Sequence, residues 1–376
     1  MRTLTAAGLF AILVSFGAAG QLQSARQASR AAAPHAAEQS AEAKAKAAEK
    51  TARDTALRLA HVRVPSPPGT AGLRLDVNPS GPNAFAVDDV VTCRFHVEPA
   101  SGTSRKFDCE LGDGEIIRIK YGANNPELQG EVAATRLLSA FGFPADSMFV
   151  VAGVRCFGCP ADPFPLLQRC WHDGEVERAC LGPLDYTRPR DFTPAIVERK
   201  YPGEKIETSR SDGWSWDELA SIDAAAGGAP RADVDALRLM AVFLAHWDNK
   251  ARNQRLVCLD EAWDELAPCR RPLAMIADAG ATFGPPKADL EGWSAAPIWR
   301  DRASCTATMR SLPYGGSTFH DTRITESGRR RAAQLLGSLS DDQIRQLFAG
   351  ARFTNVDGWV RAFIERRRVI TDGPSC

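Results

Sequence analysis

The chain lacks an excess of charge of either sign. Its 376 residues include 46 Lys and Arg and 46 Asp and Glu, so the formal net charge is zero. Because nucleic-acid-binding proteins usually carry a basic excess and membrane-surface proteins a polybasic block, this balance argues against both partners. The sequence has no internal repeats, and after residue 20 no apolar run is long enough to span a bilayer. We therefore expect one globular unit without a later transmembrane helix.

An apolar run does stand at the N-terminus. A short positive start at residues 1–2 precedes the apolar stretch Leu4–Ala19, and small residues at Gly17–Gly20 suit cleavage. This pattern predicts a secretory signal peptide over residues 1–20, with an uncleaved anchor as the alternative by length. The protein is accordingly expected to be exported, either to a periplasm or to the outside of the cell.

The next segment, residues 21–69, is poor in apolar side chains. It is rich in Ala, Glu, Lys and Gln, and Glu42 and Lys46 are spaced for an i,i+4 ion pair. The pattern predicts a solvated helix, linker or stalk that ends at the Pro-rich run over residues 64–69. The remaining three hundred or so residues suit a two-lobed domain.

Export changes the interpretation of the ten cysteines, because an oxidising compartment favours disulfides. Cys93 and Cys109 are symmetric about Ser101, so a regular hairpin would place them opposite each other at a distance compatible with a disulfide. Cys258 and Cys269 flank an insertion that a second bridge could close.

Four further cysteines cluster at Cys156, Cys159, Cys170 and Cys180. They could form a zinc knot, but no histidine completes a standard ligand pattern, and export favours two disulfides. A redox role for the C-x-x-C pair is weaker, because no thioredoxin-like βαβ pattern surrounds it. No pairing is predicted for Cys305 and Cys376.

The strongest motif is the run His246–Asn253, which reads H-x-D-x-K-x-x-N. It follows an apolar helical stretch at Val234–Ala245 and precedes a strand-like run at Arg255–Leu259. A second motif, Asp278-Ala279-Gly280, ends the apolar run over residues 273–277. An aspartate that engages a hydroxyl, with an asparagine and a second aspartate that hold magnesium, is the set that phosphoryl transfer needs.

The N-terminal half offers matching groups. The β-type run Glu115–Lys120 ends in a lysine, and the apolar periodicity over residues 126–141 predicts a helix. Glu131 is a better partner for Lys120 than Glu127, because it lies a full turn inside that helix. Two strand-like runs upstream are joined by Ala100–Ser104, where Gly102 and small hydroxyl residues could present backbone N–H groups to phosphate or form a plain β-turn.

These motifs together resemble the protein-kinase-like fold. The plan is similar to that of atypical, exported kinases, such as secretory-pathway kinases, and to HipA-type and phosphatidylinositol-kinase-like kinases. The resemblance implies an α+β fold that contains disulfides. A small antiparallel β N-lobe is expected at residues 70–202, with a Cys-rich insertion at 156–190, and a mainly helical C-lobe at 203–376.

The resemblance also implies catalytic roles. Asp248 is expected to orient or deprotonate the acceptor hydroxyl, and Lys250 to neutralise charge on the transferred phosphoryl group. Asn253 and Asp278 are expected to hold Mg²⁺ or Mn²⁺ between the phosphates.

The same resemblance implies a site for ATP. Lys120, fixed by Glu131, would contact the α- and β-phosphates, and the loop that contains Gly102 would cover them. The strand-like run Ala195–Tyr201 would lead into the hinge, where the backbone at Val197 and Glu198 would meet the adenine.

The chain departs from the kinase pattern at several points. Trp247 replaces the arginine that often receives an activation-loop phosphate, and Ala279 replaces phenylalanine. The sequence has no clear A-P-E motif and no glycine triad. We therefore expect neither regulation by activation-loop phosphorylation nor a peptide groove of the usual type.

Three functions remain open at this stage. The first is an exported kinase that transfers the γ-phosphoryl group of ATP to a protein or small-molecule hydroxyl. The second is a kinase-fold enzyme that transfers AMP, because the metal-binding residues would serve both reactions. The third is a non-catalytic pseudokinase that serves as a binding module, which the scarcity of ATP outside the cytoplasm favours and the complete Lys-Asp-Asn-Asp set disfavours.

Overall fold

The computed structural model describes residues 42–64, 69–125, 127–208, 212–260, 269–313 and 316–372. The chain divides into two compact units, residues 1–52 and residues 53–376. Residues 42–52, the described part of the first unit, belong to a helix over residues 42–59. The predicted signal peptide, residues 1–20, lies outside the described residues. No described helix combines the length and the apolar character that crossing a membrane requires.

The second unit begins within the predicted linker. The prediction of a solvated linker over residues 21–69 does not hold from Arg53 onward, because Leu57 and Ala60 are buried in the main hydrophobic core. The guanidinium of Arg53 is buried as well, and it donates to both carboxylate oxygens of Glu218 at 2.9 Å. The helix therefore ends as part of the folded unit.

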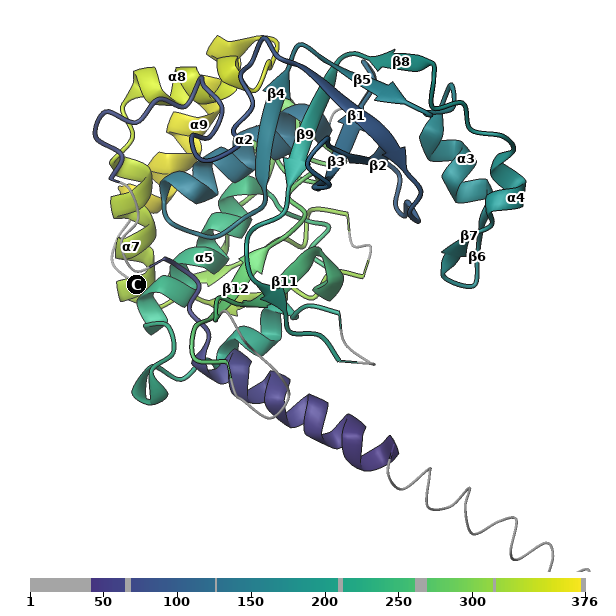
Figure 1. Cartoon of the computed structure of the whole chain (residues 1–376). Helices are drawn as coiled ribbons and strands as arrows, with labels where there is room; N and C mark the ends of the chain where they lie inside the picture. The colour runs from purple at the N-terminus through teal and green to yellow at the C-terminus, as the bar shows by residue number, and fades with distance from the viewer. Residues whose placement is uncertain are drawn as a thin grey trace, which may run out of the picture. The chain divides into compact units, whose positions relative to one another are not determined.

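A seven-stranded sheet forms the N-lobe, in the order β4-β9-β3-β2-β1-β5-β8 (Figure 1). The strands are β1 (Val90–His96), β2 (Lys106–Glu110), β3 (Ile116–Tyr121), β4 (Ser147–Val151), β5 (Gly153–Phe157), β8 (Pro189–Phe192) and β9 (Ala195–Arg199). Neighbouring strands are antiparallel except for β1 and β5, which are parallel. The predicted antiparallel N-lobe is therefore present, and it is extended by β5 and β8.

Alternation along β3 sends its side chains to the two faces of the sheet. Ile117 and Ile119 are buried beside Phe107 in an apolar core on one face. Arg118 and Lys120 lie on the other face, which borders the cleft described below. Helix α2 (Glu127–Ala140) packs on that face at β4, and its apolar residues join the core of the C-lobe.

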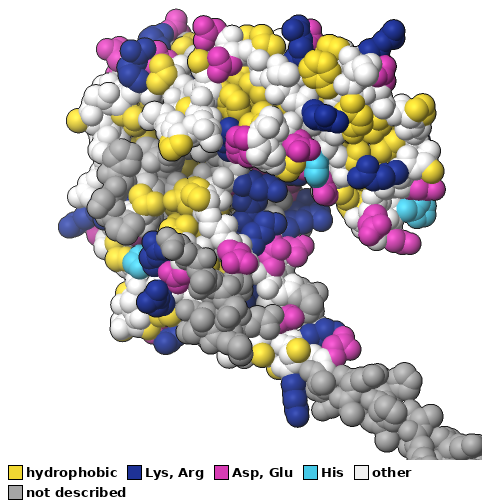
Figure 2. Space-filling model, in the orientation of Figure 1, with side chains coloured by type: hydrophobic (Ala, Val, Ile, Leu, Met, Phe, Trp, Pro, Cys, Tyr) yellow, Lys and Arg dark blue, Asp and Glu magenta, His cyan; other side chains and the backbone are white. Residues whose placement is uncertain are grey.

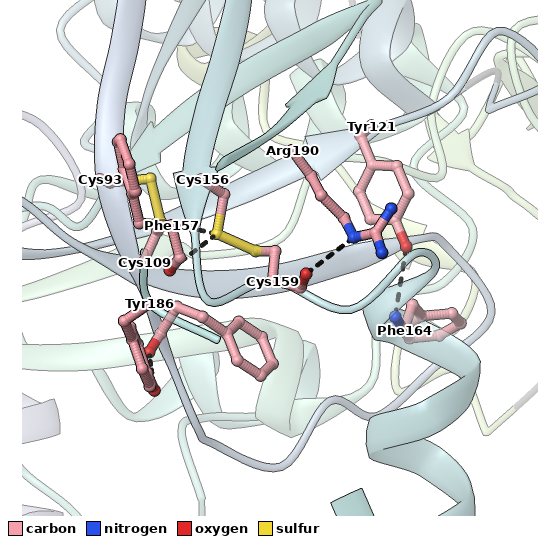
Figure 3. Close-up of a disulfide and its surroundings, with 10 residues drawn as sticks. Cys93, Cys109, Tyr121, Cys156, Phe157, Cys159, Phe164, Tyr186 and Arg190 are labelled. Atoms are coloured by element: carbon pink, nitrogen blue, oxygen red, sulfur yellow. Dashed lines mark hydrogen bonds between the residues drawn. A yellow bond between two sulfur atoms is a disulfide. The ribbon is translucent and has the colours of Figure 1, made fainter. Parts of the chain in front are cut away.

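The Cys-rich insertion lies between β5 and β8. It contains α3 (Pro163–Arg169), β6 (Trp171–His172), β7 (Glu175–Val176) and α4 (Arg178–Leu181). The side chains of Phe164 and Leu167 from α3 enter the core on the face of the sheet away from the cleft. The hydroxyl oxygen of Tyr121, at the end of β3, accepts a hydrogen bond from the Phe164 backbone N–H at 3.2 Å (Figure 3). The insertion is thus anchored beside the strand that carries Lys120.

Disulfides within the described residues join Cys93 to Cys109, Cys156 to Cys159, Cys170 to Cys180, and Cys258 to Cys269. The two predicted pairs, Cys93–Cys109 and Cys258–Cys269, are confirmed. The cluster at residues 156–180 forms two disulfides, so its sulfurs are not available as a zinc knot. Cys305 is also disulfide-bonded, and Cys376 lies outside the described residues.

The Cys93–Cys109 bridge forms in a different register from the predicted hairpin. Cys109 lies opposite Phe95, and the Cα partner of Cys93 is Cys156 on the parallel strand β5. The nine-residue connection over residues 97–105 is longer than a tight turn, which explains the shift of two positions. As a result, the Cys109 and Cys156 sulfurs of two separate disulfides lie 3.8 Å apart (Figure 3).

The C-lobe is mainly helical, as predicted. Its helices are α5 (Arg231–Leu244), α6 (Leu290–Ala295), α7 (Glu326–Gly337), α8 (Asp341–Gly350) and α9 (Val356–Thr371). Its short strands are β10 (Glu204–Lys205), β11 (Gln254–Cys258), β12 (Pro272–Ile276), β13 (Trp299–Asp301), β14 (Thr306–Ala307) and β15 (Thr322–Arg323). Trp293 and Trp359 are buried among aromatic rings, as expected of packing residues.

Arg366 of α9 joins the ends of two other helices. Its buried guanidinium donates to the backbone carbonyl oxygens of Val242 and Phe243 in α5 and of Trp293 and Ala296 at α6. Burial lowers its pKa to about 9, which still leaves it protonated at neutral pH. The last turn of α5, directly before the run His246–Asn253, is therefore held by α9.

Candidate active site

The first element of the site is a buried ion pair. Lys120, at the end of β3, donates to the two carboxylate oxygens of Glu131 at 2.7 and 2.5 Å, and Glu198 lies 3.2 Å away. All three side chains are buried. Burial acts to lower the pKa of Lys120, but the two carboxylates outweigh it and raise that pKa well above its usual value. Lys120 is therefore a fixed cation.

The second element is the loop after α5. The helix ends at Ala245, whose left-handed conformation (φ 54°) turns the chain toward the cleft. The Asn253 side-chain amide donates to the backbone carbonyl oxygen of Asp248 at 2.5 Å, and the ammonium of Lys250 lies 2.8 Å from the Asp248 carboxylate. Since its NH₂ group is used in this way, Asn253 keeps its amide oxygen as a possible metal ligand.

Within this loop Asn249 and His246 are buried, and hydrogen bonds of the Asn249 side chain hold the loop in place. The Asn249 side-chain oxygen accepts hydrogen bonds from the Ser317 hydroxyl at 2.6 Å and from two backbone N–H groups, those of Thr318 and Phe319. Its amide donates to the carbonyl oxygen of His246. Burial lowers the pKa of His246, which keeps the imidazole neutral. The motif search missed the role of Asn249, because a buried amide has no signature in sequence.

The third element is Asp278, two residues after β12. The backbone N–H groups of Ala277 and Asp278 both donate to the carbonyl oxygen of Asn253 at 3.0 Å, which holds the two predicted metal ligands side by side. The carboxylate of Asp278 accepts from the Gly280 N–H at 3.0 Å. Burial acts to raise the pKa of Asp278, but Lys120, Lys106 and the Gly280 N–H hold it far below its usual value.

The residues at this point fit a hard divalent cation. Asp278 is anionic at any ordinary pH, and Asn253 offers a neutral amide oxygen beside it. Carboxylate and amide oxygens are the ligands that Mg²⁺ and Mn²⁺ prefer, with substrate phosphates completing the coordination.

The fourth element is the loop over residues 100–104. Lys287 of the C-lobe donates to the hydroxyls of Ser104 at 2.9 Å and Thr103 at 3.2 Å, and its ammonium lies 2.5 Å from Glu127 of α2. Gly102 has a φ of 91°, which favours glycine. The loop is thus tied to both lobes at the mouth of the cleft.

These elements enclose one cleft of about 260 Å³. Seven of the predicted site residues line it: Gly102, Lys120, Glu198, Asp248, Lys250, Asn253 and Asp278. Glu131 lies behind Lys120. Val197 is not brought to the cleft, because its side chain lies in the core on the opposite face and its strand is paired on both sides.

The cleft also contains charged residues that were not among the predicted site residues. They are Lys106, Arg118, Glu127, Arg252 and Arg255. Figure 2 shows Lys and Arg side chains gathered in a hollow between the sheet and the C-lobe. Lys106 and Arg118 could have been found from the sequence, since both alternate with apolar residues on their strands and so belong to the face that carries Lys120.

Comparison with known proteins adds little at the level of sequence, since no family model and no curated protein matches the chain. The chain is similar to solved structures of kinases. It matches the Helicobacter pylori proinflammatory kinase CtkA at 9% identity and a TM-score of 0.40, over 75% of this chain and 95% of that one. It matches the Golgi casein kinase at 12% identity and a TM-score of 0.36, over 76% and 73% of the two chains.

A second structure of the Golgi casein kinase, with Mn/ADP bound, matches at 11% identity and a TM-score of 0.34, over 76% of this chain and 72% of that one. All three TM-scores lie below 0.5. The two lobes, the Lys120–Glu131 pair and the placement of Asp248, Asn253 and Asp278 across the cleft are the features of the protein-kinase-like fold predicted from the motifs. The predicted fold is confirmed.

Proposed function

We propose that this protein is an exported kinase that transfers the γ-phosphoryl group of ATP to a hydroxyl group of a protein or small molecule. The observation that carries the proposal is the pairing of Lys120 with Glu131 in a cleft that Asp248, Asn253 and Asp278 also line. An ion pair with a purely structural role would not require two oxygen ligands, Asn253 and Asp278, to be held side by side in the same cleft by backbone hydrogen bonds.

The chain's own residues have distinct roles in this proposal. Asp248 accepts the proton of the acceptor hydroxyl, and its orientation is held by Lys250 and by the Asn253 bond to its backbone. Lys120 binds the α- and β-phosphates as a fixed cation, and Lys250 offsets charge on the phosphoryl group in transfer. Most of the rate enhancement would come from positioning and charge stabilisation.

Asn253 and Asp278 would hold Mg²⁺ or Mn²⁺. A cation held there would supply positive charge that offsets the negative charge of the phosphates. The carboxylate of Asp278 is suited to this because it stays ionised next to Lys120 and Lys106.

Export is supported by two independent features. The apolar run Leu4–Ala19 follows a positive start, and the described residues contain four disulfides. Disulfides persist in oxidising compartments and are rare in the cytosol.

The test is metal-dependent nucleotide binding, measured as the shift in unfolding temperature of the full chain with ATP and Mg²⁺ or Mn²⁺. At a ligand concentration about a hundred times its Kd, binding stabilises the folded state by about 2.7 kcal/mol, which raises the unfolding temperature by several degrees. We expect that shift in the wild type, and none when EDTA removes the metal.

Two variants make the test specific. Asp278→Ala should lose the shift, while Asp191→Ala, which removes an exposed aspartate on β8, should keep it. An equal shift in Asp278→Ala, or no shift in a folded wild type, would overturn the assignment. If the nucleotide binds, the increase in mass of an acceptor incubated with ATP distinguishes transfer of a phosphoryl group from transfer of AMP.

A further inference from the structure

The walls of the cleft carry charge where a nucleobase would need an apolar surface. Of the sixteen described residues that line it, six are basic, four are acidic, and Ala277 has the only apolar side chain larger than hydrogen. Small-molecule sites are usually lined by apolar and aromatic groups, with few polar contacts. Placing a base against these walls would remove water from charged groups without forming a matching contact.

The two lobes each contribute an arginine to these walls. Arg118 of β3 forms two hydrogen bonds to Asp108, at 2.7 and 3.0 Å, and Arg255 of β11 lies 3.2 Å from Asp146. Both guanidinium groups are partly exposed to the cleft. Because each is fixed by a carboxylate, neither can easily move aside to open an apolar slot.

The hinge side offers no backbone contact at the predicted position. Val197 and Glu198 belong to β9, which pairs with β3 on one side and β4 on the other. Their backbone groups are therefore committed to the sheet. The Glu198 carboxylate faces Lys120 and does not form part of an apolar wall.

Lys106 shows which ligand the cleft does suit. It lies directly across the β2–β3 ladder from Lys120, and like charges in that arrangement repel. Lys120 is neutralised by two carboxylates, whereas the side-chain ammonium of Lys106 makes no hydrogen bond or ion pair with any described residue. Its ammonium lies next to Gly102, where a Cβ would be 3.5 Å from it. An anion bound in the cleft would form an ion pair with the Lys106 ammonium.

We propose that the cleft recognises the phosphate chain of its donor together with a divalent cation and does not recognise a base, so that inorganic polyphosphate can donate the phosphoryl group. The proposal rests on the proposed kinase function. In the transfer, the bond between the terminal phosphorus and its bridging oxygen breaks, and a bond from that phosphorus to the acceptor oxygen forms. The shortened polyphosphate leaves with the bridging oxygen, and the hydroxyl proton passes to Asp248.

The experiment is calorimetric titration of the full chain with ATP, GTP, inorganic tripolyphosphate and adenosine, at constant free Mg²⁺. We expect the Kd values of ATP, GTP and tripolyphosphate to agree within about threefold, and adenosine not to bind, because the base contributes less than about 0.7 kcal/mol. Binding of ATP tenfold or more tighter than tripolyphosphate would overturn the proposal. Binding of ATP and GTP alike, each tenfold or more tighter than tripolyphosphate, would also overturn it, and would indicate a base stacked on Arg118 or Arg255.

A variant tests the role of Lys106. Lys106→Ala should weaken ATP, GTP and tripolyphosphate by the same factor, on the order of tenfold for one lost charge-assisted hydrogen bond. The control is Lys205→Ala, an exposed lysine on β10, which should bind as the wild type does. Unchanged binding in a folded Lys106→Ala would overturn the assignment of Lys106. The titrations of the wild-type protein test the proposal independently of whether any variant folds.

The outcomes separate this proposal from the kinase function. If no phosphate compound binds in the presence of metal, both fail. If ATP alone binds tightly, the kinase function stands and the proposal for polyphosphate fails. Transfer from tripolyphosphate to a substrate would support both.

Discussion

Removal of Lys120 should destabilise the protein through the carboxylates it leaves behind. In the variant Lys120→Met, Glu131 and Glu198 keep their buried positions without a cation between them. Breaking a buried ion pair by removing one partner costs about 3–5 kcal/mol, because the remaining charge is uncompensated. We expect the free energy of unfolding at pH 7.5 to fall by about that amount.

The loss should depend on pH in a defined direction. Burial raises the pKa of Glu131, Lys120 acts to lower it, and Asp278 and Glu198 act to raise it. Without Lys120 that pKa rises further, so the folded variant binds a proton that the unfolded chain releases at neutral pH. Stability of the variant relative to the wild type therefore recovers as the pH falls through the interval between the pKa of Glu131 in the variant and its lower pKa in the wild type.

Urea unfolding followed by circular dichroism measures both effects. The double variant Lys120→Met/Glu131→Leu should lose less stability than Lys120→Met, because it buries one fewer uncompensated charge. Lys205→Met, which replaces an exposed lysine, should change stability by less than about 0.5 kcal/mol. A loss below about 1 kcal/mol in Lys120→Met, with no pH dependence, would show that the pair is solvated and would refute the reasoning.

Two further predictions concern the C-lobe. The double variant Cys258→Ser/Cys269→Ser opens a bridge of sequence separation 11 and should lower the free energy of unfolding by about 3 kcal/mol, seen as a lower unfolding temperature; an unchanged temperature would contradict this. His246 should titrate below the usual pKa of about 6.5 because it is buried, so stability falls as the pH drops through 6.5, where only the unfolded chain takes up the proton. An imidazole midpoint at or above 6.5 by NMR would be inconsistent with that burial.

Local patterns were enough to predict seven of the sixteen described residues that line the cleft. Glu131 could be chosen over Glu127 because a position one turn inside an amphipathic helix faces the sheet on which that helix packs. Asp248, Asn253 and Asp278 followed from fixed spacing, and the structure adds the reason that they meet: the β11–β12 hairpin places Asn253 beside Asp278.

What could not be predicted depends on contacts that are distant in sequence. The parallel pairing of β1 with β5, with Cys93 opposite Cys156, joins residues that are 63 positions apart in sequence, and no local pattern encodes which strands meet. Arg53 and Leu57 were assigned to a solvated helix because their segment is polar overall, although one short apolar face is enough to join a core.

The alternation of side chains along a strand could have excluded the Val197 side chain from the cleft at the level of sequence. Ile119, its partner across β3, faces the apolar core, and Val197 must face the same way. The resemblance to kinases suggested a hinge contact at this position, whereas the sheet uses the backbone there for pairing on both sides.

The bonds of Arg366 have a consequence for local unfolding. The guanidinium links α9 to the carbonyl oxygens of Val242 and Phe243, and the loop that carries Asp248 begins three residues later. Backbone amides at the end of α5 are thus expected to exchange with solvent only when α9 detaches, as one cooperative unit. Detachment of the last helix would then release the loop that carries Asp248 even while the disulfide-linked sheet remains folded, so we expect the candidate site to be lost before the β-structure.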